Sequence, residues 1–473
     1  MKVFAVSDCH VECAQNKRWL QGLPTFGPDT ALIVAGDLGV TLTQVRWALL
    51  LFKQRFEHVF FCWGNHECWH APEPAGADAG ENAAEYDPQD PESPLPVRFR
   101  NYANSLEKLQ MLKQLCESIG VHTSPQKMGG VWIVPVCSWY HFSWDREPSL
   151  DQLVNLPLDT QPSIAWDLAG DRILCKWPEV GKDGQSLEFG SEAFAQFVDD
   201  ELNTMFGILP LRGGLTRDLG LGANRPPIIS FSHFLPRQEL LPEKRFLFHP
   251  NLAGIVGSDY VRKRVEEELE SDVHVFGHTH FEWDVHLHHL HGPSRPRAGD
   301  PEAASQHNGQ TPSLGRRRVT RYRSWPLGNP REQAERRAWL NGEEIERWWP
   351  VLVFDSRSGE GIGGAESSSR AGASGCACDS EGKGLQRNCP TSASLYPKHE
   401  VCFFSRLYEE GHVVRGSLPA HLPDYTAVMY CAAAPRLDWD ALCKQVDRHW
   451  KDQHPRAAGD LLVGGGVHSK QKH

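Results

Sequence analysis

The stretch that determines the fold is KVFAVSDCH at residues 2–10, a short apolar run that ends in an aspartate and a histidine. The same arrangement of an apolar run followed by polar side chains recurs in ALIVAGD at 31–37, HVFFCWGNHE at 58–67, IISFSH at 228–233 and VHVFGHTH at 273–280. Short apolar runs bounded by turn-forming residues are typical of buried strands. The first three segments are spaced as in strand–loop–helix–strand units. We therefore expect strands that deliver these polar side chains to one edge of a sheet.

The sequence between these segments supports such a fold. Residues 41–56 and 101–119 carry apolar side chains on one helical face, and Gly120 is a residue type that commonly follows a helix end. Residues 131–137 are a further expected strand. Strand–helix alternation followed by strand-rich sequence predicts the α/β class, with a sandwich of mixed sheets flanked by helices.

The polar residues that follow the strands are types that bind metals. Carboxylate, imidazole and amide groups suit divalent ions of the Mn, Fe or Zn class. Asp37 is the natural bridge between two ions, because a carboxylate has two oxygens. On an extended strand, Asp8 and His10 would point to the same side, as would His278 and His280. The expected ligands of two divalent ions are Asp8, His10, Asp37, Asn65, His233, His278 and His280.

Two such ions define the chemistry that we expect. Ions roughly 3.5–4 Å apart can hold a water between them and lower its pKa from about 15.7 to near 7. The resulting hydroxide would attack the phosphorus of a phosphate monoester or diester. The departing alkoxide needs a proton, and His66, beside Asn65, is placed to supply it as the catalytic residue.

The motifs resemble those of the calcineurin-like metallophosphoesterase superfamily, whose pattern is D-x-H, G-D, G-N-H-[DE], a lone H and G-H-x-H. The resemblance covers about residues 1–290. It implies a β-sandwich flanked by helices, and a histidine matching His66 that acts on the leaving group. The ligand sets that it implies are Asp8, His10, Asp37 and His280 for one ion, and Asp37, Asn65, His233 and His278 for the other.

The flanking sequence is similar to uncharacterised members of this superfamily from plants, algae and protists. The segments that carry this similarity are SWYH at 138–141, CKWP at 175–178, GS at 257–258 and WPLGNP at 325–330. They extend the expected phosphoesterase domain to residues 1–355. Within it, His141 and Arg146 are candidates for substrate binding, with solvated surface as the alternative for both and core packing as a further alternative for His141.

Four stretches depart from the pattern of the domain. Residues 71–98, rich in Pro, Ala, Gly and acidic side chains, are expected to be a disordered insertion. Residues 291–318 are expected to be an insertion between two antiparallel strands. The Gly- and Ser-rich residues 356–398 are typical of a linker. The C-terminal extension, residues 399–473, has no assigned role, and a protein partner could bind there.

Beside the phosphate-ester substrate, charge and composition make nucleic-acid and membrane partners unexpected. The chain has 49 basic and 60 acidic residues and a net charge of −11, which argues against broad nucleic-acid or membrane binding. Basic and aromatic residues do not interleave as expected in a nuclease. No apolar run is long enough to span a membrane. The thirteen cysteines form no Cys-x-x-Cys pairs and the first residues lack signal-peptide features, so we expect reduced thiols and a cytoplasmic location.

Two other functions stay open at this point. Serine/threonine protein phosphatases carry arginines in G-D-x-x-D-R-G and R-G-N-H-E, whereas here Leu38-Gly39-Val40 follows Asp37 and Trp63 precedes Gly64. Glu67 matches the phosphatase motif, but the missing arginines argue against that class. The other alternative is a non-enzymatic metal-binding scaffold for partner proteins, and the complete set of ligands argues for the enzyme.

Overall fold

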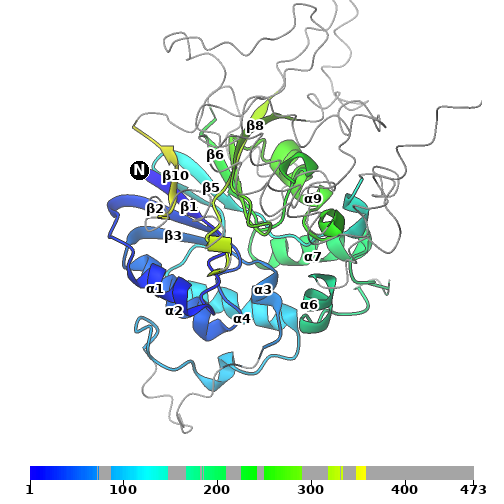
Figure 1. Ribbon diagram of the computed structural model, residues 1–473, viewed down its shortest axis with the longest axis horizontal. Coiled ribbons are helices and arrows are strands. Elements are labelled where there is room, and N and C mark those ends of the chain that lie inside the picture. The colour runs from blue at the N-terminus through cyan, green and yellow to red at the C-terminus, as the bar shows by residue number, and fades with distance from the viewer. Residues whose placement is uncertain are drawn as a thin grey trace, which may run out of the picture.

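The strands of the chain form two mixed sheets (Figure 1). The computed structural model describes residues 1–71, 73, 87–146, 167–181, 184, 186–208, 225–241, 250–289, 318–330, 332–333 and 348–357. This arrangement confirms the predicted α/β sandwich of mixed sheets flanked by helices.

The first sheet contains the N-terminal strands in the order β10-β1-β2-β3. Neighbours β1, β2 and β3 are parallel, and β10 pairs antiparallel with β1. The bounds are Lys2–Val6 for β1, Gly27–Ala35 for β2, Phe56–Cys62 for β3 and Val351–Asp355 for β10. Because β1, β2 and β3 are parallel, their carboxyl ends meet at one edge of the sheet.

The second sheet has the order β4-β5-β6-β7-β9-β8. Strands β5, β6, β7 and β9 run parallel, whereas β4 and β8 pair antiparallel with their neighbours. The antiparallel pair β8 and β9 flanks the predicted insertion at residues 291–318, as expected. The bounds are Gln126–Met128 for β4, Val131–Pro135 for β5, Ile228–Phe231 for β6, Val273–Phe276 for β7, Trp283–His288 for β8 and Val319–Ser324 for β9.

The central strands are apolar on both faces because one face packs against the other sheet and the opposite face packs against helices. In β2, Ala31 and Ile33 belong to a buried cluster with Ile133 and Ile229 of the second sheet, so this cluster fills the space between the sheets. The alternate side chains, such as Leu32, belong to a larger cluster that includes residues of the helices. The period of two along a strand separates these two cores.

Helices cover the outer faces of the two sheets. Figure 1 shows α1, α2 and α4 gathered on one side of β1–β3, and α7 and α9 on the side of the second sheet. The bounds are Ala14–Gln21 for α1, Leu42–Lys53 for α2, Asn65–Cys68 for α3, Ser105–Ser118 for α4, Asp167–Leu174 for α6, Glu192–Met205 for α7 and Asp259–Arg262 for α9.

Several elements are shorter than the sequence predicted, and side chains account for their ends. Helix α2 begins at Leu42 because the Thr41 side chain caps it together with Gln44. Helix α4 begins at Ser105, not at residue 101, because the Asn104 side chain accepts a hydrogen bond from the amide of Glu107.

The predicted disordered insertion at residues 71–98 is partly wrong. Residues 87–98 are described and pack against α2. The buried Arg46 of that helix donates hydrogen bonds to the backbone carbonyls of Asp87, Asp90 and Ser93, and Leu95 lies in the core. Three carbonyl acceptors for one guanidinium explain how a segment of this composition is held in place.

The remaining predictions on domain organisation concern residues outside the described ranges. These are most of the insertion at residues 291–318, the linker at 356–398 beyond residue 357, and the extension at 399–473. Their boundaries and the protein partner of the extension stay predictions. Among the described residues, no helix is long and apolar enough to cross a membrane.

Candidate metal centre

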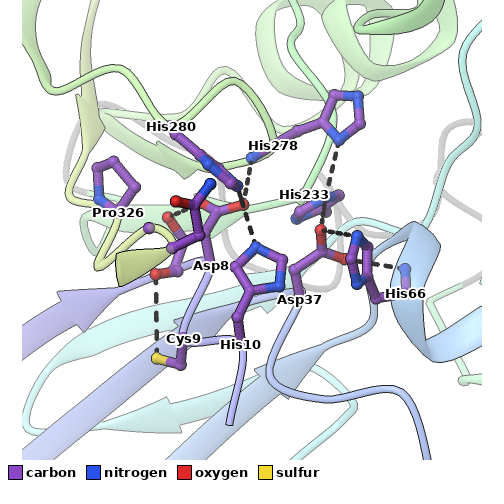
Figure 2. Close-up of polar contacts among 12 residues, drawn as sticks. Asp8, Cys9, His10, Asp37, His66, His233, His278, His280 and Pro326 are labelled. Carbon is purple, nitrogen blue, oxygen red and sulfur yellow. Dashed lines mark hydrogen bonds and ion pairs between the residues drawn. The ribbon is translucent and has the colours of Figure 1, made fainter. Parts of the chain in front are cut away.

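The predicted ligands converge where the parallel strands end. Asp8 follows β1, Asp37 follows β2, His233 follows β6 and His278 follows β7, while Asn65 opens α3. Figure 2 shows the side chains of Asp8, Asp37, His233 and His278 pointing toward one another, with Asp37 between His10 and His66. Three overlapping groups of three could each hold an ion, namely Asp8, His10 and His280; His10, Asp37 and His66; and Asp37, His233 and His278.

The first group, Asp8, His10 and His280, brings two ring nitrogens and a carboxylate oxygen close together. His10 Nε2 lies 3.0 Å from His280 Nε2, and the latter lies 3.4 Å from Asp8 Oδ1. The other ring nitrogens face carboxylates, because His10 Nδ1 is 3.1 Å from Glu12 Oε1 and His280 Nδ1 is 2.7 Å from Glu332 Oε2. A neutral imidazole has one N–H, which these carboxylates attract to Nδ1. With both rings neutral, as metal binding requires, the two Nε2 atoms would present lone pairs to each other, which fits a shared cation.

The group of Asp37, His233 and His278, with Asn65 beside it, has the same character. His233 Nε2 lies 3.1 Å from both Asn65 Oδ1 and His278 Nδ1, and 3.4 Å from Asp37 Oδ2. The other nitrogens of the two rings are 3.0 Å from the backbone carbonyls of Ala35 and Ile255, so these nitrogens carry the protons. With His233 neutral, as metal binding requires, four acceptors would face one another in a buried place, which fits a second cation.

Backbone conformation brings the ligands together in a way that the sequence reasoning missed. Seven described residues other than glycine have positive φ, and five of them are predicted ligands: Asp8, His10, Asp37, His278 and His280. The expectation that Asp8 and His10 share a side through strand alternation is therefore wrong, because both lie beyond the end of β1. They meet because left-handed turns redirect their side chains. Such conformations cost of order 1–3 kcal/mol each and concentrate at functional sites.

Two glycines allow the ligands to approach the backbone closely. A Cβ added to Gly36, whose φ is +80°, would lie 2.4 Å from His233 Nδ1. A Cβ on Gly64 would lie 2.2 Å from Asp37 Oδ1. The G-D and G-N-H motifs thus need glycine because ligands occupy the space that a side chain would fill.

The charges of the site are strongly coupled. Burial alone would raise the pKa of Asp8, but His280 lowers it to about 2. Burial would lower the pKa of His233, yet Asp37 raises it to about 9. Burial likewise opposes protonation of His280, whose pKa Glu332 and Asp8 raise well above its usual value. The carboxylates are therefore ionised at neutral pH and attract cationic partners.

His66 lies at the rim of this group, next to the bridging carboxylate. Its Nε2 is 3.7 Å from Asp37 Oδ2, its Nδ1 is 3.5 Å from Glu12 Oε1, and its ring stacks on Trp69 with centroids 3.7 Å apart. Burial lowers the pKa of His66, but Asp37 and Glu12 raise it above its ordinary value overall. The ring is thus held between two carboxylates and an indole, and the carboxylates favour its protonated form.

Glu67 connects two ligand-bearing loops. Its Oε1 accepts hydrogen bonds from the amides of Leu38 and Gly39, and its Oε2 accepts from those of Asp37 and Gly64. The carboxylate is buried, so these four amides depend on it as their acceptor. The resemblance of Glu67 to a phosphatase motif therefore reflects a structural role in joining the G-D loop to the G-N-H helix.

Four residues that support the ligands were not identified from the sequence. They are Glu12, Glu67, Asp171 and Glu332, which contact His10, Asp37, Asn65 and His280 respectively. Glu12 and Glu67 stand beside ligand motifs, and that proximity was a signal. The other two lie far from their partners along the chain and follow no motif that points to the site.

The two residues predicted to bind substrate have protein partners. His141 is buried, its Nδ1 lies 2.9 Å from Ser143 Oγ, and its Nε2 accepts from the amide of Asp259 at 3.3 Å. Arg146 is more than half exposed and donates to Asp259 Oδ2 at 2.5 Å. Of the alternatives, solvated surface fits the exposed Arg146, and core packing fits the buried His141. Substrate binding by either residue stays a prediction.

A family comparison agrees with the geometry. Residues 1–203 match the family model described as calcineurin-like phosphoesterase. The matched residues make up less than half of the chain. The motifs that supply His233, His278 and His280 lie beyond the matched residues, yet their side chains complete the groups begun by Asp8 and Asp37. The metals that this family uses are divalent, which agrees with the ligand types assembled here.

Two comparisons point to one protein of Mycobacterium tuberculosis. The chain is 40% identical over 67 residues to "[Acyl-carrier-protein] phosphodiesterase PptH", a match of 14% of this chain and 21% of that protein. The chain thus matches about a fifth of the length of this curated relative. The crystal structure of phosphopantetheinyl hydrolase PptH is similar at a TM-score of 0.44 and 18% identity, over 74% of this chain and 95% of that one.

Proposed function

We propose that this chain is a dinuclear metal-dependent phosphoesterase that hydrolyses a phosphate monoester or diester. The observation that carries the proposal is the convergence of two sets of acceptor atoms around Asp37. Mn, Fe or Zn-class ions suit the mixture of carboxylate, imidazole and amide. The residues that would hold them are Asp8, His10, Asp37 and His280 for one ion, and Asp37, Asn65, His233 and His278 for the other.

Bound ions would supply Lewis-acid activation of a water and charge neutralisation of the phosphoryl oxygens. The part assigned to the chain itself is proton donation by His66. Asp37 and Glu12 favour its protonated form, and the stack on Trp69 fixes the plane of its ring. A protonated imidazole at the rim can donate to the departing oxygen, which general acid catalysis requires.

Because the relative from Mycobacterium tuberculosis is named a phosphodiesterase, a diester should be tested beside a monoester. Metal-stripped protein would be titrated separately with Mn, Fe, Zn and Mg while hydrolysis of para-nitrophenyl phosphate and bis-para-nitrophenyl phosphate is followed. We expect turnover to return at about two ions per chain, as in two-metal sites. The faster of the two esters would define the class.

Two variants separate the roles of the residues. His66→Ala should lose most activity and keep its metal, because His66 stands at the rim. Asp37→Ala should lose both activity and metal, because Asp37 belongs to both proposed ligand sets. His58→Ala, a partly exposed histidine of β3, is the matched control and should behave as the unaltered protein. An active Asp37→Ala protein without metal would contradict the mechanism, and two bound ions without turnover on either ester would favour the scaffold.

A further inference from the structure

Asp171 of α6 is a buried carboxylate that receives three donors from three different parts of the site. Its Oδ1 accepts from Asn65 Nδ2 at 3.0 Å and from Trp69 Nε1 at 2.6 Å, and its Oδ2 accepts from the Tyr140 hydroxyl at 3.0 Å. The side chain is 3% exposed. This buried aspartate contacts both a predicted ligand, Asn65, and the Trp69 indole that stacks on His66. It is therefore placed to orient both side chains.

The contact with Asn65 determines which end of its amide faces the metal group. Asn65 Oδ1 points to His233 Nε2 and His278 Nδ1, each 3.1 Å away, while Nδ2 points to Asp171. If the amide rotated by half a turn, its NH₂ group would face the ligand nitrogens and its oxygen would face a carboxylate. Asp171 disfavours that rotation, because a carboxylate attracts a donor and repels an acceptor.

The contact with Trp69 acts on His66. The Trp69 ring stacks on the His66 imidazole at an interplanar angle of 27°, and its Nε1–H is held by Asp171. The backbone links the same pieces, because the amide of His70 donates to the carbonyl of Leu174 in α6 at 2.6 Å. Helix α6 and the turn after α3 are therefore joined by side chains and by backbone.

We propose that Asp171 is a positioning residue that holds Asn65 in its metal-binding orientation and Trp69 against His66. The inference rests on the proposed dinuclear function and deepens it. Partners of this kind around a ligand typically contribute roughly 10- to 100-fold to metal affinity. Asp171→Ala should weaken one of two metal equivalents by that factor and leave the other, held by Asp8, His10 and His280, unchanged.

The conservative variant distinguishes orientation from simple loss of packing. In Asp171→Asn, Oδ1 can still accept from Asn65 and Trp69, and the new NH₂ group can donate to the Tyr140 oxygen. We therefore expect Asp171→Asn to restore the second metal. Asp199 of α7 offers a matched control, since it too is a buried helical aspartate with several donors, from Arg264 and Asn203. Asp199→Asn should lower stability without a selective effect on one metal.

The experiment is a calorimetric titration of metal-stripped full-length protein with Mn²⁺, combined with electron paramagnetic resonance of the loaded protein. The unaltered protein and Asp171→Asn should bind two equivalents and give the spectrum of a coupled pair. Asp171→Ala should bind one equivalent with unchanged affinity and the second about 10- to 100-fold more weakly, and should give an isolated-ion spectrum at Mn²⁺ concentrations that fill only the tighter site. Asp171→Ser, which keeps a polar group in the space, replaces it if the alanine variant does not fold.

The outcomes separate this inference from the proposed function. An unaltered protein that binds fewer than two Mn²⁺ ions would overturn the dinuclear proposal and this inference with it. Two equivalents in the unaltered protein, bound with equal affinity by Asp171→Ala or Asp171→Ser, would overturn the role of Asp171 alone. An Asp171→Asn protein as defective as the alanine variant would also overturn it, because an acceptor alone would then not suffice.

Discussion

Replacing Glu67 by glutamine tests how the fold holds two ligand loops together. Each Glu67 oxygen accepts two backbone amides, at 2.7 and 3.1 Å for Oε1 and at 3.0 and 2.6 Å for Oε2. Glutamine retains one oxygen and replaces the other with an NH₂ group, which is itself a donor. Two amides therefore lose their acceptor and meet a donor instead.

The magnitude follows from these two amides. A buried donor left without a partner costs about 1–3 kcal/mol, so two of them cost about 2–6 kcal/mol. That is a large share of the roughly 5–15 kcal/mol by which domains are stable. If the glutamine keeps its oxygen toward Leu38 and Gly39, the amides of Asp37 and Gly64 are released. The bridging carboxylate and the start of α3 would then shift, so metal affinity should fall together with stability.

Urea unfolding of metal-stripped protein measures the loss of stability, and metal titration measures the loss of metal affinity. Glu57→Gln is the matched control, because Glu57 also accepts a backbone amide, that of Asp29 at 2.6 Å, but is exposed. The control should lie within about 0.5 kcal/mol of the unaltered protein. A Glu67→Gln protein that is equally stable and binds metal unchanged would refute the reasoning.

Three further predictions follow from other contacts. Burial lowers the pKa of His274 to about 3. The neutral ring therefore stabilises the fold fully above the unfolded-state pKa of about 6.5, and this stabilisation is lost as the pH falls below that value. Between pH 7 and 5 the unfolding free energy should fall by about 2 kcal/mol more than in His274→Asn. Gly36→Ala should displace His233 and lose one metal. Gly27→Ala is the control, because Gly27 has a φ of +87° and no atom lies within 4 Å of the added Cβ, so this variant carries the same backbone strain and should keep both metals. Equal metal binding by the two variants would contradict this prediction. Metal binding near pH 7.5 should release protons, because His233, with a pKa of about 9, must become neutral to bind an ion; a calorimetric heat that is independent of the ionisation enthalpy of the buffer would contradict it.

The strands, and the polar residues that converge at their ends, could be predicted from the sequence because their signals are local. The apolar runs ending at Val6, Ala35 and Phe276 form strands, and polar residues follow each of them. The turns between strand and ligand could not be predicted in the same way. Asp8 and His10 adopt positive φ, which only the surrounding structure stabilises, so strand alternation explained their proximity incorrectly.

Partners that are distant along the chain were also beyond sequence reasoning. Asp171 lies 106 residues from Asn65, and Glu332 lies 52 residues from His280. An isolated acidic residue is ordinarily solvated surface, and only the tertiary fold brings these two to the site. The segment at 87–98 shows the opposite error, because a polar, Pro-rich composition suggested disorder where the carbonyls of the segment bind the buried Arg46.

The most direct test of the central claim is X-ray anomalous scattering from crystals of Mn- or Zn-loaded protein, measured on both sides of the absorption edge of the metal. We predict two separate peaks, one contacted by Asp8, His10 and His280 and the other by Asn65, His233 and His278, with Asp37 contacting both. A single peak, or two peaks that do not share Asp37, would contradict the dinuclear centre.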